Sequence, residues 1–313
     1  MPSRAGFLAL VLGAMTLLAL SPATSASPAA ARSVRHSSPW LVPSSPRLLG
    51  VLASPWQSDE YERALKTHVQ VIANFMPFGS RDMPTNRLAE AQRRGLTPMI
   101  SWLPREPSSK ASPHAFQPAF SNAAIAAGRE DRYIRRFAQA CARFHGTLLL
   151  RYAPEMEGPW EPWHRNPAAY VAAWKRVHRI FREEGATNVK FVWSPALPWQ
   201  GYKGGFAAWL RLIHRYWPGT RLVDYVGATV VSHNGQGVDY FERRLPLLRR
   251  YRKPVVLAEV HAPERLRETW LPDLAAMVNR MPWVRVVVWC DLTPRTPITA
   301  SPARLALRSI EYE

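Results

Sequence analysis

The chain has 313 residues, of which 47% are hydrophobic and 20% are charged, and its formal net charge is +18. This much apolar sequence can build a full core, so the composition excludes global disorder. The length suits one large α/β barrel or two ordinary domains. The basic residues are spread over several predicted helix faces and do not alternate with aromatics in a binding motif. We therefore expect no nucleic-acid partner. Anionic cell-surface polymers are the more plausible partners for the positive charge.

The first 26 residues have the pattern of a secretory signal peptide. Arg4 supplies a positive charge, residues 7–20 are apolar, and small residues at 24–26 or 29–31 offer a cleavage site. The apolar stretch is shorter than the about 20 residues of a membrane span. We expect a secreted monomer with no membrane span after cleavage. Residues 27–46 are rich in Ser, Pro and Ala and are interpreted as a linker, which leaves residues 47–313 as the folded domain.

Eight short apolar runs recur along this domain, separated by sequence of helical periodicity. They are Leu48–Ala53, Val69–Phe75, Thr97–Trp102, Thr147–Tyr152, Val189–Trp193, Val223–Val230, Pro254–Glu259 and Val284–Trp289. Near-continuous apolar strands suit a parallel sheet covered by helices. Eight strands that alternate with helices predict an α/β fold, a single-domain (β/α)8 TIM barrel. No glycine-rich phosphate loop follows the first run, which argues against an open dinucleotide-binding sheet.

The helices between these runs are predicted from apolar stripes and end signals. Asn166 is expected to cap a helix that begins at Pro167 and ends at Gly185. The chain has only two cysteines, Cys141 in a predicted helix and Cys290 in the last strand. Because these elements lie on different sides of a barrel, we expect two buried thiols rather than a disulfide.

The segment from Arg151 to Trp163 contains three carboxylates and two indoles within nine residues, directly after an apolar run. Catalytic groups of such barrels lie at the C-terminal ends of strands. The fourth run leads into Glu155 and the seventh ends in Glu259. Two glutamates that face each other across the barrel mouth support a double displacement at a sugar. The alternative is that both are ordinary solvated loop acids.

Several sequence blocks, in order, resemble glycoside hydrolase family 26, whose best-known members are endo-β-1,4-mannanases. They are residues 128–134, 151–163, 188–195, 216–219 with 223–227, and 253–259. The resemblance implies that Glu155 is the general acid/base and Glu259 the nucleophile, with net retention and without a cofactor or metal. Retention requires carboxyl groups about 5–5.5 Å apart. The implied partner is a polysaccharide substrate.

Further site residues are expected around this pair. Arg151 lies four residues before Glu155 on the same strand face and is expected to hold Glu259 charged, with a purely structural ion pair as the alternative. Trp160, Trp163 and Trp289 are candidate sugar platforms, and Trp193 and Trp102 are weaker ones; for each, core filling is the alternative. His233 and Asp291, beyond the sixth and eighth runs, complete the candidate substrate-binding set.

Three positions depart from the family pattern. Pro154 replaces its His, Glu157 replaces its Asn, and Val231 replaces its strand-six Tyr, a gap that Thr229 or His233 could fill. Glu157 could bind a sugar hydroxyl, raise the pKa of Glu155, or be a solvated loop residue. The histidines match no metal spacing. The departures leave two alternatives to mannan hydrolysis: a hydrolase of β-glucan or of the producer's own exopolysaccharide, and a barrel that binds polysaccharide without cutting it.

Overall fold

The computed structural model of the protein describes residues 46–107, 115–164, 166–198, 202–232, 235–290 and 307. In this part of the chain eight parallel strands form a closed barrel in sequence order, and β8 pairs with β1. The predicted (β/α)8 barrel is therefore confirmed. The expected signal peptide and linker, up to residue 45, lie outside the described residues, and their boundaries stay predictions. No helix in the described ranges is long and apolar enough to cross a membrane.

The strands lie close to the predicted runs. They are β1 (Leu48–Leu52), β2 (Val71–Pro77), β3 (Thr97–Leu103), β4 (Leu148–Tyr152), β5 (Val189–Trp193), β6 (Tyr225–Val231), β7 (Val255–His261) and β8 (Val284–Trp289). The predicted bounds of β5 and β8 are confirmed. The strands β2 and β7 extend two residues beyond their predicted ends, toward the end of the barrel where catalytic groups gather.

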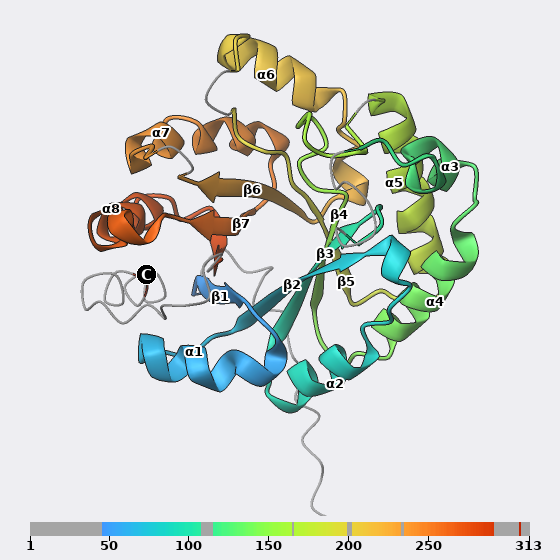
Figure 1. Cartoon of the computed structure of the whole chain (residues 1–313), viewed down its shortest axis with the longest axis horizontal. Helices are drawn as coiled ribbons and strands as arrows, with labels where there is room; N and C mark the ends of the chain where they lie inside the picture. The colour runs from blue at the N-terminus through green and yellow to red at the C-terminus, as the bar shows by residue number, and fades with distance from the viewer. Residues whose placement is uncertain are drawn as a thin grey trace, which may run out of the picture. The chain divides into compact units, whose positions relative to one another are not determined.

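Helices surround the barrel (Figure 1). The α-helices are α1 (Ser58–Leu65), α2 (Thr85–Arg93), α3 (Asn122–Ala126), α4 (Asp131–Ala142), α5 (Pro167–Glu183), α6 (Gly205–His214), α7 (Val238–Glu242) and α8 (Arg267–Asn279). Short 3-10 helices cover Pro55–Gln57, Phe78–Ser80, Pro118–Phe120, Thr220–Leu222, Leu245–Tyr251 and Glu264–Leu266. The Asn166 side chain accepts a hydrogen bond from the Ala169 amide at 3.0 Å, which confirms the predicted cap of α5.

Two apolar layers result from the alternation of side chains along the strands. One fills the barrel and includes Val71, Met99, Leu149, Val256 and Val288. The larger one lies between the barrel and its helices. Cys141 belongs to the outer layer and Cys290 to the inner one, and both are buried free thiols, as predicted.

A β-bulge in β7 changes the direction of one side chain. Leu257 is paired with Ala228 and Glu259 with Thr229, so Ala258 is an extra residue relative to β6. Strict alternation from the inward-facing Val256 would place Glu259 on the outer face of the barrel. The extra residue instead places Glu259 beside Thr229, because a bulge re-aims the side chain that follows it.

Candidate active site

The fully buried Arg151 in β4 brings the two predicted catalytic glutamates together. Its guanidinium is hydrogen-bonded to the Glu259 carboxylate, and its Nη2 lies 3.7 Å from Glu155 Oε1. Its other N–H groups donate to three hydroxyls at 2.9–3.3 Å, on Ser194, Thr229 and Ser101. Because a buried guanidinium is costly unless it is paired, the position of both carboxylates is tied to that of Arg151.

A tight turn after β4 positions Glu155. Ala153 and Glu155 have positive φ values of 41° and 53°, a conformation that costs non-glycine residues about 1–3 kcal/mol and is concentrated at functional sites. The Glu155 amide donates to the Ser194 carbonyl at 2.7 Å. The Glu155 carboxylate accepts hydrogen bonds from Trp160 Nε1 at 2.7 Å and from the Thr229 hydroxyl. Thr229, one of the two residues considered for the gap at Val231, thus bonds both Glu155 and Arg151.

Neither glutamate is sealed below the barrel mouth. The Glu155 and Glu259 side chains are 14% and 18% exposed. Burial and the charge of Glu155 raise the pKa of Glu259, and the Arg151 guanidinium opposes this rise. The two carboxyl groups therefore share one guanidinium, which places both at the same end of the barrel.

The candidate tryptophans do not all reach this site. Trp160 is half-buried and bonded to Glu155, so a sugar can contact it. Trp163 is buried, and its indole N–H donates to the Pro154 carbonyl at 2.8 Å, which fixes the turn. Trp193, Trp289 and Trp102 are fully buried in the outer layer. The placement of these three corresponds to core filling, the alternative weighed above, and leaves them no face for a sugar.

Glu157 is buried rather than solvated. It lines a pocket of about 370 Å³ together with His164, Pro167, Leu212, Arg215 and Tyr216. Neither of its carboxyl oxygens has a hydrogen-bond partner that meets normal geometry among the described residues. Burial, aided by the charge of Glu155, raises the pKa of Glu157 well above its usual range. The charge of Glu155 thus acts on Glu157, and the interpretation of Glu157 as a solvated loop residue is wrong.

The carboxylate that shares the site is Glu161, which the sequence had not singled out. Burial raises the pKa of Glu161 to about 8; Arg105 opposes the rise, and Glu155 and Glu259 add to it.

The sequence reasoning also missed an aromatic side chain at the end of β2. Phe75 follows the inward-facing Val71 and Ala73 at even spacing on β2, is in register with Ser101, and is 40% exposed. An exposed phenylalanine on the inner face at a strand's end is a recognisable signal for a sugar platform.

Two predicted residues, His233 and Asp291, lie outside the described residues. His261 is described, and its Nδ1 lies 2.9 Å from the Cys290 carbonyl oxygen while its ring stacks on Trp289. No group of three or more potential metal-ligating side chains occurs in the described ranges.

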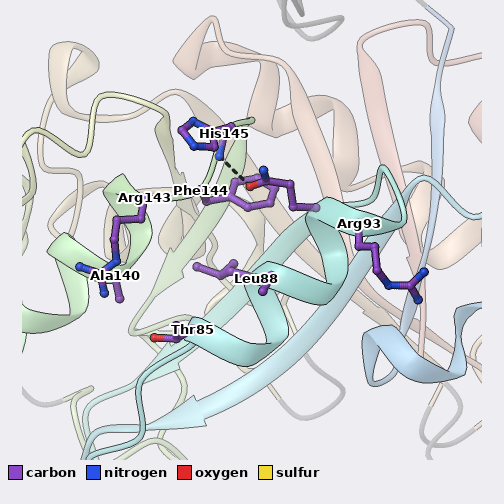
Figure 2. A pocket seen from close by; sticks show the side chains of 9 residues that line it. Thr85, Leu88, Arg93, Ala140, Arg143, Phe144 and His145 are labelled. Atoms are coloured by element: carbon purple, nitrogen blue, oxygen red, sulfur yellow. Dashed lines mark hydrogen bonds between the residues drawn. The ribbon is translucent and has the colours of Figure 1, made fainter.

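A second pocket lies against the outer helices. Figure 2 shows this pocket of about 520 Å³, lined by residues of α2, α4 and the turn after α4: Thr85, Leu88, Ala89, Gln92, Arg93, Ala140, Arg143, Phe144 and His145. The His145 amide donates to Gln92 across it at 3.0 Å. Its lining contains no carboxylate and therefore lacks the groups that glycoside hydrolysis needs.

No family model matches the sequence. The chain is 28% identical over 230 residues to endoglucanase H of Acetivibrio thermocellus. The matched region covers 66% of this chain and 23% of that protein. It is 23% identical over 251 residues to a beta-1,3-xylanase of Alcaligenes sp. This match covers 77% of this chain and 50% of the xylanase. The chain thus spans half or less of the length of these curated relatives.

Solved structures share the barrel. A family 26 β-mannanase of Bacteroides ovatus matches with a TM-score of 0.64 at 16% identity, covering 85% of this chain and 89% of that one. An endo-β-1,4-mannanase of Cellulomonas fimi matches with a TM-score of 0.62 at 12% identity. This match covers 85% of this chain and 70% of the mannanase chain. The predicted resemblance to glycoside hydrolase family 26 is confirmed at the level of the fold.

Proposed function

On this barrel, shared with family 26 β-mannanases, we propose that the chain is a retaining, endo-acting glycoside hydrolase of a β-linked polysaccharide. The observation that carries the proposal is the pair of partly exposed glutamates, one after β4 and one in β7, that meet at the buried Arg151. The names of the curated relatives, an endoglucanase and a xylanase, support the same substrate class.

Each residue of the site has a chemical task in this reaction. Glu259 attacks the anomeric carbon while Glu155 protonates the leaving glycosidic oxygen, which gives a covalent glycosyl intermediate. Glu155 then removes a proton from water, which displaces Glu259 and regenerates both groups. Arg151 favours the ionised form of Glu259, and the bonds from Trp160 and Thr229 orient Glu155. Trp160 and Phe75 offer apolar faces to sugar rings.

The finer proposal is endo-β-1,4-mannanase-like specificity, which the mannanases among the solved neighbours support. Hydrolysis of a β-glucan or of the producer's own exopolysaccharide is the alternative, favoured by the departures at Pro154, Glu157 and Val231 and by the xylanase and endoglucanase relatives. A panel of mannans, xylans, β-glucans and host exopolysaccharide, assayed for reducing ends, separates these substrates.

The enzyme itself is tested with isosteric variants. We expect Glu155→Gln and Glu259→Gln each to lower the release of reducing ends by about 10²-fold or more, because each removes an essential proton donor or nucleophile. Azide added to Glu259→Ala should give a glycosyl azide of inverted configuration, and azide added to Glu155→Ala one of retained configuration. Absence of turnover by the unmodified protein, with polysaccharide binding that survives both glutamine substitutions, would instead support a non-catalytic binding barrel.

We also propose that the protein is exported by residues 1–26 and acts as a secreted monomer, on the basis of the signal-like N-terminus. Mass spectrometry of protein from the culture medium should find an N-terminus near residue 27 or 32. Full-length protein confined to the cells would contradict export, and sedimentation of the secreted form tests the monomer.

A further inference from the structure

Glu161 has a buried carboxyl oxygen that the fold leaves without a hydrogen bond. The side chain is 14% exposed, and its Oε2 is buried with no hydrogen-bond partner among the described residues. Among the cations that the structure describes, Arg105 pairs with Glu161, and its Nη1 lies 3.7 Å from Oε2, too far for a direct hydrogen bond. A buried unsatisfied acceptor is costly, so its retention beside a reaction centre requires an explanation.

The pair connects the loops that follow β3 and β4. Arg105 is two residues beyond β3, and its guanidinium lies 6.0 Å from the centre of the Trp163 ring. Trp163 is anchored to the Pro154 carbonyl, directly before Glu155. Glu161 itself follows Trp160, the donor to Glu155. The charges of Glu155, Glu259 and Arg151 all act on Glu161, so its carboxyl lies within electrostatic range of the reaction centre.

A carboxyl and a guanidinium side by side match the chemistry of a sugar. The carboxyl accepts a hydrogen bond and the guanidinium donates, whereas each sugar hydroxyl can do both. Arg105 and Glu161 are 21% and 14% exposed, so part of each side chain can contact a ligand, and a rotation of the Glu161 carboxyl is needed to bring the buried Oε2 to it. A uronate at this place would face three carboxyl groups, those of Glu155, Glu161 and Glu259, which disfavours an anionic unit.

We propose that Glu161 and Arg105 form a sugar-recognition pair that binds two neighbouring hydroxyls of a neutral glycosyl unit beside the scissile bond. The Glu161 carboxyl accepts from one hydroxyl, and the Arg105 guanidinium donates to the other. The proposal rests on the proposed function, because it assigns a substrate contact in the same cleft. It makes the pair a determinant of which β-glycan is accepted, through the positions of the hydroxyls.

The test separates binding from turnover. In the Glu259→Gln background, oligosaccharide affinity measured by calorimetry should fall about tenfold in Glu161→Leu, because a sugar hydroxyl would lose its acceptor and be left without a hydrogen bond. Glu161→Gln, which keeps an acceptor, should retain more affinity. The matched control is Glu242→Gln, which changes an exposed pair with Arg280 and should leave affinity unchanged.

In the active protein, Glu161→Leu should raise KM by a similar factor with a smaller effect on kcat. It should also change the ratio of kcat/KM between a mannan and a glucan, whose sugar units differ in the orientation of one hydroxyl. A purely structural role would leave this ratio unchanged. The thermal midpoint identifies a variant that fails to fold, and Glu161→Gln then replaces it. Unchanged affinity and an unchanged ratio in both Glu161 variants would overturn the proposal.

Two further outcomes keep the proposals apart. Preference for a uronate polymer that Arg105→Gln abolishes would overturn recognition of a neutral unit. If the unmodified protein turns nothing over while Glu161→Leu still weakens oligosaccharide binding, the hydrolase proposal fails and the recognition pair stands.

Discussion

Arg151 is the buried cation between the carboxylates of Glu155 and Glu259, and its removal should therefore affect both stability and chemistry. In Arg151→Met, burial and Glu155 would act on Glu259 without opposition, so its pKa should rise further and the nucleophile should be largely protonated. We expect kcat/KM at neutral pH to fall by roughly 10²-fold or more. We expect the free energy of unfolding to fall by about 3–5 kcal/mol, as when one partner of a buried ion pair is removed.

Denaturant unfolding and steady-state kinetics measure these two effects of Arg151→Met. The control is Arg280→Met, which breaks an exposed pair with Glu242 and should cost less than about 1 kcal/mol. Equal losses of stability in the two variants would contradict the role of Arg151.

The raised pKa of Glu259 also predicts the acid side of the pH–rate profile. Glu259 attacks only when ionised, so kcat/KM should fall as the pH decreases through its pKa. Because that pKa lies above the ordinary value of 4.5, the acid limb should lie above pH 4.5. Glu259→Asp, which keeps a carboxylate, should retain an acid limb. An acid limb at or below pH 4.5 in the unmodified protein would show that Arg151 outweighs burial.

At this scale the sequence identified the charged centre and misjudged part of its surroundings. Glu155, Glu259 and Arg151 are recognisable because Arg151 lies in the fourth apolar run, Glu155 follows it, and Glu259 ends the seventh run. Trp193 and Trp289 could not be placed, because strands of a parallel sheet are apolar on both faces and give no period that separates inside from outside. Glu157 and Glu161 lie four residues apart in one irregular loop, where no periodicity indicates which carboxyl faces the cleft.

Among the elements, the turn after β4 depends on a glycine. A Cβ at Gly158 would lie 2.5 Å from the Trp160 indole, so Gly158→Ala must displace the ring that donates to Glu155. The loss of one hydrogen bond to a charged group, about 1.5–3 kcal/mol, should lower kcat by about 10–100-fold. Trp160→Phe removes the same donor without crowding and should show a similar loss. Activity retained in Gly158→Ala but lost in Trp160→Phe would show that the turn tolerates a side chain.

The strands illustrate what a sequence can specify for such a fold. Their order and number followed from apolar runs, whereas their ends follow from pairing with neighbours: β2 continues to Pro77 because that residue is in register with Leu103 of β3. The bulge at Ala258 was not predictable, because an inserted residue in a continuous apolar strand leaves no mark in the pattern. It nevertheless decides that Glu259 faces the site.

On the scale of the whole molecule, the positive charge and the reaction centre are different features. The chain has 41 Lys and Arg against 23 Asp and Glu, and exposed arginines occur on separate elements, among them Arg132, Arg211 and Arg250. The candidate site, by contrast, combines three carboxyl groups, those of Glu155, Glu161 and Glu259, with Arg151 and Arg105. The surface should therefore attract anionic polymers by long-range forces, whereas a neutral substrate should be bound by short-range contacts.

Salt separates these two interactions, because screening shortens from about 10 Å at 0.1 M to about 3 Å at 1 M ionic strength. Raising NaCl over this range should elute the protein from an anionic polysaccharide matrix while kcat/KM on a neutral β-glycan changes by less than about twofold. Retention on an uncharged matrix of the same polymer class is the control. If hydrolysis itself fell steeply with salt, the substrate in the cleft would have to be anionic, contrary to the neutral unit proposed for Glu161 and Arg105. If the protein did not bind the anionic matrix even at low salt, the proposal that its surface attracts anionic polymers would be wrong.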